Sequence, residues 1–193
     1  MNMPEINNKT VNAIDDRLFV KIPRRVKYEK IFPQCSYTLH FDGCSKGNPG
    51  PSGIGAVIYK GEQEIWSKSE YIGDDKTNNQ AEYLALIMGL SNAISSGIEQ
   101  IYVFGDSQLV INQINNVYKV KNRSLFELYE KVSYLKQRFK YIEFNHVYRE
   151  ENKRADELAN NAFKLWYNNL NNISDEIYED IDKRSNKLKL PYL

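Results

Sequence analysis

The fold is decided by residues 37–60, which read YTLHFDGCSKGNPGPSGIGAVIYK. Apolar and polar residues alternate from Tyr37 to Asp42, and this period of two predicts a strand with one buried face. Residues 43–53 are rich in Gly, Pro, Asn and Ser, a composition that predicts a turn. Residues 54–60 predict a second strand, so the segment is expected to begin an antiparallel meander.

Outward from this segment, the pattern predicts strands and helices as far as about residue 170. We expect a third strand over 65–71, a helix from Thr77 that ends at Gly97, a strand over 100–104, helices over 107–116 and 125–139, a strand over 141–148 and a helix over 155–170. This order predicts an α/β fold with a five-stranded mixed sheet. An antiparallel meander would be extended by parallel strands and flanked by helices.

Length and composition indicate one globular domain with tails. The 193 residues are 41% hydrophobic and 26% charged, which is the balance of an ordinary globular protein. The periodic pattern lies in residues 36–164, which we interpret as the domain. Residues 1–35 show no sustained period and are interpreted as a basic extension or linker, and residues 165–193 as the end of the last helix and a charged tail.

The charge balance restricts the partners. A net charge of +1 excludes a protein that holds nucleic acid mainly by bulk positive charge. The leader 1–35 is more basic, with seven basic and four acidic side chains. No apolar run approaches the roughly 20 residues that a membrane span needs, and no secretory signal is evident. We therefore expect no membrane association and an intracellular, cytoplasmic protein, with a nuclear location left open. Cys35 and Cys44 are expected to be incidental thiols.

Four carboxylates fall where a ligand site is expected. Asp42 ends the first predicted strand and Asp106 the fourth, while Glu82 and Asp156 lie in the first turns of helices. Ligands collect beyond the carboxyl ends of strands in such sheets, so the four side chains can converge. A cluster of this kind repels itself unless a divalent cation neutralises it, and oxygen ligands favour Mg²⁺ or Mn²⁺.

Each carboxylate also has a local explanation. Glu82 could form a capping box with Asn79, and Asp156 could complement a helix dipole. Asp106 could cap the helix that follows it, and Asp42 could belong to a turn with the next glycine. Taken one at a time, the four residues leave both interpretations open.

Taken together and in order, four segments resemble the motifs of type 1 ribonuclease H. The segments are 41–53 (FDGCSKGNPGPSG), 77–83 (TNNQAEY), 105–110 (GDSQLV) and 149–159 (REENKRADELA). The resemblance spans residues 36–164, which would be the catalytic domain. It implies a ribonuclease H-like fold and an endoribonuclease that hydrolyses the RNA strand of RNA–DNA hybrids, leaving a 3′-hydroxyl and a 5′-phosphate.

The resemblance also implies roles for single residues. Asp42, Glu82, Asp106 and Asp156 would bind two Mg²⁺ ions, for which Mn²⁺ could substitute. Ser45, Asn48, Asn79 and Gln108 match positions that contact the hybrid, and Thr77 matches one that contacts a DNA phosphate. Local capping and turn bonding is the other interpretation of these five residues.

The sequence departs from the family pattern in two places. Some members carry a mobile histidine before the fourth motif, but His146 lies within a strand pattern, so we expect it to be structural and take Arg149 as the accessory catalytic residue. The basic protrusion of some bacterial members is missing. Lys119, Lys121 and Arg123 leave a small basic patch in its place.

Two other functions remain open at this stage. One is a related nuclease of the same superfamily, such as a junction resolvase or transposase core, and the other is a nucleic-acid-binding domain without catalysis. We expect a monomer that binds RNA–DNA hybrid. The chemistry would serve primer removal, hybrid clearance or work within replication or reverse-transcription machinery, and the sequence does not choose among them.

The basic leader leads to a first prediction. If residues 1–33 add phosphate contacts, their deletion raises the KM for hybrid and weakens its salt dependence, because such contacts are lost as salt rises. Steady-state kinetics at several salt concentrations measure both quantities. An unchanged KM with an unchanged salt dependence would contradict the hypothesis.

Overall fold

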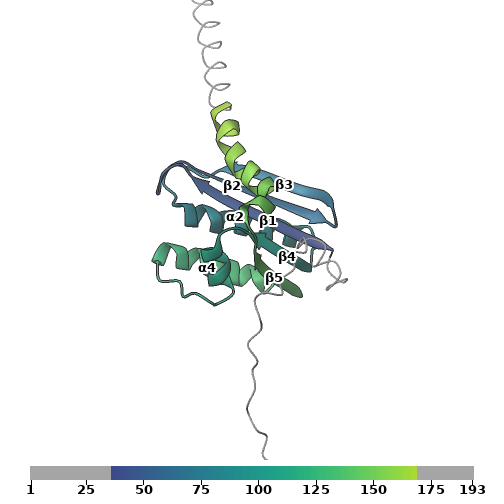
Figure 1. Cartoon of the computed structure of the whole chain (residues 1–193). Helices are drawn as coiled ribbons and strands as arrows, with labels where there is room; N and C mark the ends of the chain where they lie inside the picture. The colour runs from purple at the N-terminus through teal and green to yellow at the C-terminus, as the bar shows by residue number, and fades with distance from the viewer. Residues whose placement is uncertain (1–35, 169–193) are drawn as a thin grey trace, which may run out of the picture. The chain divides into compact units, whose positions relative to one another are not determined.

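The computed structural model describes residues 36–168, which form a five-stranded sheet with helices packed against it (Figure 1). The strand order is β3-β2-β1-β4-β5. Strands β1 (Tyr37–Ser45), β2 (Ser52–Lys60) and β3 (Gln63–Tyr71) form the antiparallel meander. Strands β4 (Gln100–Gly105) and β5 (Tyr141–His146) extend the sheet with parallel pairing. The predicted α/β fold with a mixed sheet is confirmed.

The pairing of β1 differs on its two sides. Its whole length pairs with β2, from Tyr37 opposite Lys60 to Ser45 opposite Ser52. The register with β4, however, runs only from Thr38 to Phe41. Residues 42–45 of β1 therefore have a strand on one side alone, which leaves room beside them for side chains from other elements.

The helices begin where polar caps satisfy their first amides. Helix α2 (Asn78–Ser95) has Thr77 as its N-cap, and Thr77 and Gln80 form a capping box. Helices α3 (Gln108–Ile114) and α4 (Arg123–Lys136) are capped by Ser107 and Asn122. A further helix occupies residues 153–168. Gly97 follows α2 with a φ of +72°, which fits the predicted end of that helix.

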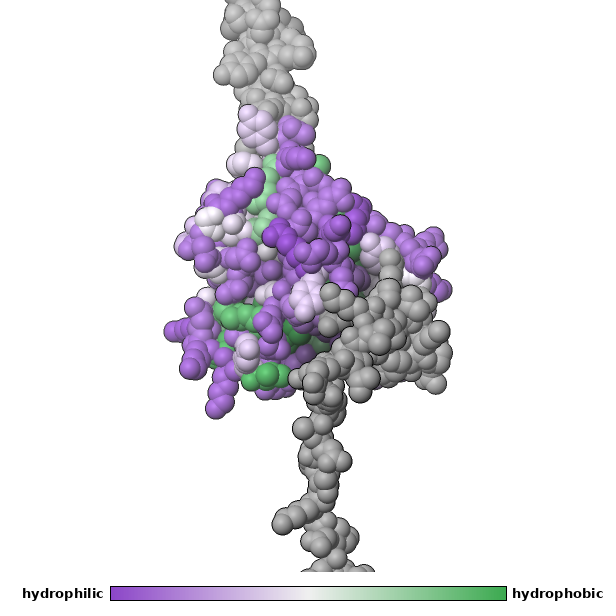
Figure 2. Space-filling model, viewed as in Figure 1, coloured by the Kyte–Doolittle hydropathy of each residue, from purple (hydrophilic) through white to green (hydrophobic). Residues whose placement is uncertain are grey.

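The sheet has a helical layer on each face. Alternate residues of β2, such as Ile54 and Ile58, join the apolar core with α2 and α4. Gly53 and Gly55 point to the other face, where they lie against Ala159 of the helix over 153–168. Burial of the core leaves a largely hydrophilic exterior, as Figure 2 shows for one face.

The ends of β1 and β5 differ from the predicted ones. Strand β1 continues to Ser45, past the turn predicted at residue 43, because its partner β2 already begins at Ser52. Strand β5 ends at His146 instead of residue 148, since a short 3-10 turn over Arg149–Glu151 follows. No helix within residues 36–168 is long and apolar enough to cross a membrane. The predictions for residues 1–35 and 169–193 lie outside the described residues.

Gly55 gives a test of how closely the helix over 153–168 packs on the sheet. A Cβ at Gly55 would lie 2.4 Å from Ala159 N and 2.6 Å from Ala155 O. We expect Gly55→Ala to lower the free energy of unfolding by about 1–3 kcal/mol, because backbone atoms must move to admit the methyl group. Urea unfolding measures the change. The control Glu62→Ala, in the exposed turn after β2, should change it by less than about 0.5 kcal/mol, and equal effects would contradict the packing argument.

Candidate functional site

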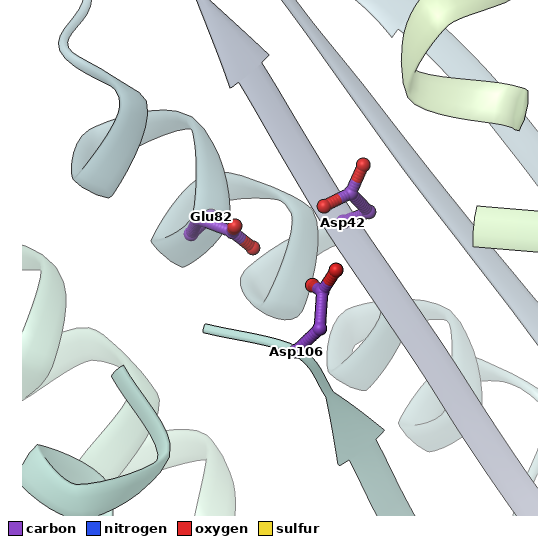
Figure 3. A group of neighbouring side chains, drawn as sticks. All are labelled: Asp42, Glu82 and Asp106. Carbon is purple, nitrogen blue, oxygen red and sulfur yellow. The ribbon is translucent and has the colours of Figure 1, made fainter. Parts of the chain in front are cut away.

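Three carboxylates from separate parts of the chain converge beside the end of β1 that has no β4 partner. Asp42 belongs to β1, Glu82 to α2, and Asp106 directly follows β4. One oxygen from each lies within 4.8 Å of the other two, and Figure 3 shows the side chains directed toward one another. The structure thus brings together three of the four predicted metal ligands.

Gly43 makes this convergence possible. A Cβ at this position would lie 2.2 Å from the carbonyl carbon of Ala81 and 2.3 Å from Glu82 N. Any side chain would therefore push α2 away from β1. Because residue 43 is glycine, the helix backbone can approach the strand closely enough to place Glu82 beside Asp42.

Two of the three carboxylates are buried and Asp106 is half-buried, and the cluster is electrostatically unfavourable without a cation. Asp42 is 6% exposed and Glu82 4% exposed. Burial, together with the charges of Asp106 and Asp156, raises the pKa of Asp42 to about 7. Burial, followed by the charges of Asp42 and Asp106, raises the pKa of Glu82 well above its ordinary value. Each shift reflects a charged form that water no longer stabilises.

These residues fit a divalent metal ion. The Oε2 atom of Glu82 is buried and makes no hydrogen bond within the described chain. A buried carboxylate oxygen without a donor is costly, and a cation would supply the missing partner. All three ligand groups are hard oxygens, which suit Mg²⁺ or Mn²⁺, so the site can hold a metal although it does not select between these ions.

Asp156 lies near the cluster but outside the three-carboxylate group. It is in the first turn of the helix over 153–168, and its charge contributes to the raised pKa of Asp42. Its Oδ1 forms an ion pair with Nη2 of Arg149. Arg149 is itself 71% exposed at its side chain. The two predicted site residues are thus brought to each other at the edge of the cluster.

The predicted hybrid contacts Ser45 and Asn48 are joined through Asn78. The backbone N–H of Ser45 donates to Oδ1 of Asn78 (3.2 Å), and the backbone N–H of Asn78 donates to Oδ1 of Asn48 (3.1 Å). The loop after β1 is therefore tied to the N-terminus of α2. The sequence interpretation missed Asn78, although its place directly after the cap residue Thr77 was a signal.

The other three predicted hybrid contacts, Thr77, Asn79 and Gln108, lie in the first turns of α2 and α3 or at the cap of α2. Thr77 accepts a hydrogen bond from the backbone N–H of Gln80 (3.3 Å), so its side chain serves as the cap of α2. Asn79 is half-buried in the first turn of α2. Gln108 is exposed at the start of α3, two residues after Asp106. Local capping is thus observed for Thr77.

Three local explanations of the carboxylates are wrong. The capping box of α2 pairs Thr77 with Gln80, so Asn79 and Glu82 do not form it. Ser107, not Asp106, caps α3. Asp42 lies inside β1 rather than in a turn.

Two residues near the cluster have structural contacts. His146 ends β5, as expected from its strand pattern, and its Nε2 lies 3.1 Å from the backbone oxygen of Asp106. Asn152, which the sequence interpretation missed, is 1% exposed and bonds to Oδ1 of Asp106 (3.3 Å). No sequence signal distinguishes Asn152 from an ordinary helix cap.

The thiol of Cys44, on β1 beside the site, is half-buried. Cys44 is free, and its Sγ faces Oδ1 of Asn160 at 3.9 Å. Burial, with the charge of Asp42, raises the pKa of the thiol to about 11. Since the thiolate is the reactive form, Cys44 stays protonated at neutral pH. The predicted incidental role of Cys35 lies outside the described residues.

The chain is similar to known proteins over the part that forms the sheet. Residues 40–162 match the family model described as reverse transcriptase-like. A ribonuclease H of Pseudomonas putida (strain W619) is 38% identical over 142 residues, covering 65% of this chain and 91% of that protein. A bifunctional protein of Mycobacterium tuberculosis is 40% identical over 125 residues, covering 64% of this chain. This chain spans 34% of the length of that mycobacterial relative.

A solved structure shares the fold. A ribonuclease H1 isolated from compost by a metagenomic approach was solved in complex with an RNA/DNA hybrid. It superposes with a TM-score of 0.64 at 39% identity, covering 68% of this chain and 99% of that one. Fold and acidic cluster thus define a domain of the reverse transcriptase-like class. Within that class, the chain belongs to the type 1 ribonuclease H family.

The raised pKa of Asp42 predicts how the metal-free protein responds to pH. The folded chain keeps a proton up to about pH 7 that the unfolded chain loses near pH 3.8. Stability from this group is therefore present below pH 3.8 and is lost as the pH rises through 7. We expect metal-free Asp42→Asn to unfold at a higher temperature than the parent at pH 8, with a smaller difference at pH 4.

The Tm of the parent and of the variant is measured from the circular dichroism signal during heating, with and without Mg²⁺. Mg²⁺ should raise the Tm of the parent at pH 8, because ligand binding to the folded state stabilises it. The Asp42→Asn variant should lose most of that increase. A difference in Tm that does not vary with pH would contradict the electrostatic origin.

Proposed function

We propose that this chain hydrolyses the RNA strand of RNA–DNA hybrids, leaving a 3′-hydroxyl and a 5′-phosphate. The observation that carries the proposal is the convergence of Asp42, Glu82 and Asp106 within 4.8 Å. The family of the chain supports it, as does the similar ribonuclease H1 that was solved with an RNA/DNA hybrid.

The metal part of the proposal is two Mg²⁺ ions held by Asp42, Glu82, Asp106 and Asp156, with Mn²⁺ as a substitute. When bound, such ions supply an activated water and stabilise the charge that develops on the phosphate. The chain supplies anchored oxygens in a buried setting, where electrostatic interactions are strong. The position of Asp156, beside but outside the three-carboxylate group, supports a role at the second ion.

We place the hybrid along the loop after β1 and the N-termini of α2 and α3. Ser45, Asn48, Thr77, Asn79 and Gln108 are the proposed contacts. The amides of Asn48, Asn79 and Gln108 can donate to phosphates and to the 2′-hydroxyls that distinguish RNA from DNA. The hydroxyls of Ser45 and Thr77 donate within the chain, to Lys76 O and Gln80 Oε1, and can accept from a 2′-hydroxyl. The bonds of Ser45 and Asn48 to Asn78 support this proposal, because they fix the loop beside the carboxylates.

Arg149 is proposed as the accessory catalytic residue. Its guanidinium is largely exposed and already pairs with Asp156 at the edge of the cluster. A cation in this place can contact a substrate phosphate or the leaving group without entering the buried centre. The proposed reaction leaves the biological setting open, so work within replication machinery, a monomeric state and a cytoplasmic location stay predictions.

A cleavage assay with Asp106→Asn tests the proposed activity. The purified chain with Mg²⁺ should cleave the RNA strand of a labelled hybrid. Asp106→Asn should reduce the rate at least about a hundredfold, a loss typical of removing one preorganised charged group. Glu99→Gln is the matched control, because Glu99 precedes β4 at the opposite end from Asp106 and pairs with Lys140.

The substrate set separates the alternatives. Duplex DNA, duplex RNA and a four-way junction are assayed beside the hybrid. Cleavage of the junction with intact hybrid would indicate a resolvase-like nuclease, and binding of hybrid without cleavage would indicate a non-catalytic domain. Either result would overturn the proposed function, as would equal rates for Asp106→Asn and the parent.

A further inference from the structure

Asn152 makes hydrogen bonds to three separate parts of the chain around the carboxylate cluster. Its Nδ2 donates to the backbone oxygen of Phe41 (2.9 Å) and to Oδ1 of Asp106 (3.3 Å). Its own backbone oxygen accepts the N–H of Asp156 (3.1 Å). One residue thus connects the strand position before Asp42, the Asp106 carboxylate and the helix turn that carries Asp156.

The burial of this amide is complete. Asn152 is 1% exposed, and its Oδ1 makes no hydrogen bond within the described chain. A buried acceptor without a partner lowers stability, so the residue is poorly suited to a role in folding alone. Its donor group, in contrast, is fully used by two acceptors, one on β1 and one directly after β4.

The donor direction follows from chemistry. Both neighbours of Nδ2 are oxygens, one a carbonyl and one a carboxylate, so the opposite amide orientation would bring oxygen against oxygen. The bond to Oδ1 of Asp106 fixes the rotation of that carboxylate. A neutral donor can do this without adding a positive charge that would compete with a cation, whereas an arginine or lysine would compete.

We propose that Asn152 is a positioning residue for the metal centre, which holds Asp106 and the start of the Asp156 helix in register with β1. The proposal rests on the proposed function, because positioning matters only if the carboxylates hold metal. Residues that hold metal ligands through hydrogen bonds commonly change metal affinity or activity by about 10-fold to 100-fold when mutated.

The variant Asn152→Ser tests the proposal. Serine retains the preference for a helix N-cap, but its side chain is too short to make both bonds. Mg²⁺ affinity is measured by calorimetry without substrate, and kcat and KM are measured on hybrid. We expect Mg²⁺ to bind about 10-fold to 100-fold more weakly and kcat to fall by a similar factor, with KM for hybrid unchanged.

Two control variants separate positioning from general stability. Asn115→Ser removes an amide bond of similar length, from Nδ2 to the backbone oxygen of Phe144 (3.0 Å), at the end of α3. Val132→Ala removes buried apolar volume from α4. Both should lower the Tm while leaving Mg²⁺ affinity and kcat unchanged. Equal losses of affinity in these controls would overturn the proposal, as would unchanged affinity in Asn152→Ser.

A measurement on the unmutated chain covers the case in which Asn152→Ser does not fold. The side-chain amide resonances of Asn152 should shift when Mg²⁺ is added, while those of Asn115 should not. Amide resonances of Asn152 that do not respond to bound Mg²⁺ would overturn the positioning role. Absence of Mg²⁺ binding or hybrid cleavage by the parent would instead refute the proposed function, so the two failures are distinguishable.

Discussion

Mutual repulsion among Asp42, Glu82 and Asp106 is opposed by the packing of the elements that carry them. Asp42 lies on β1 and Glu82 on α2, and Asp106 directly follows β4, so the packing of these elements holds the three backbone positions close together. The apolar core between the sheet and α2 supplies the opposing free energy. A bound cation would relieve this repulsion, so metal binding and folding would be coupled.

Small residues determine how closely the elements approach. Gly43 admits the backbone of α2 on one face of the sheet, and Gly55 admits the helix over 153–168 on the other. Gly43 follows Asp42 on β1, and Gly55 lies opposite Asp42 on β2. The site therefore lies where α2 approaches β1 at Gly43 and the helix over 153–168 approaches β2 at Gly55, so carboxylates from both helical layers come near Asp42.

Local patterns predicted most of the fold and part of the site. The alternation from Tyr37 to Asp42 identified β1, and strand ends placed Asp42 and Asp106 near each other. The roles of Asn78 and Asn152 could not be predicted, because their partners lie 33 and 111 residues away in sequence and such contacts leave no periodic signal. The strand end at Ser45 was missed for a related reason, since pairing with β2 outweighs the turn preference of Gly43.

The near-neutral net charge of the chain is consistent with a site made of carboxylates. The carboxylates add negative charge where a phosphate would bind. The net charge of +1 means that basic side chains barely outnumber acidic ones in the whole chain. Under the proposed function, the positive charge facing the phosphate would come from bound cations, with Arg149 at Asp156 and the basic leader 1–35 as additions. Under the same proposal, bound cations would offset the charge of the carboxylates at the scissile phosphate.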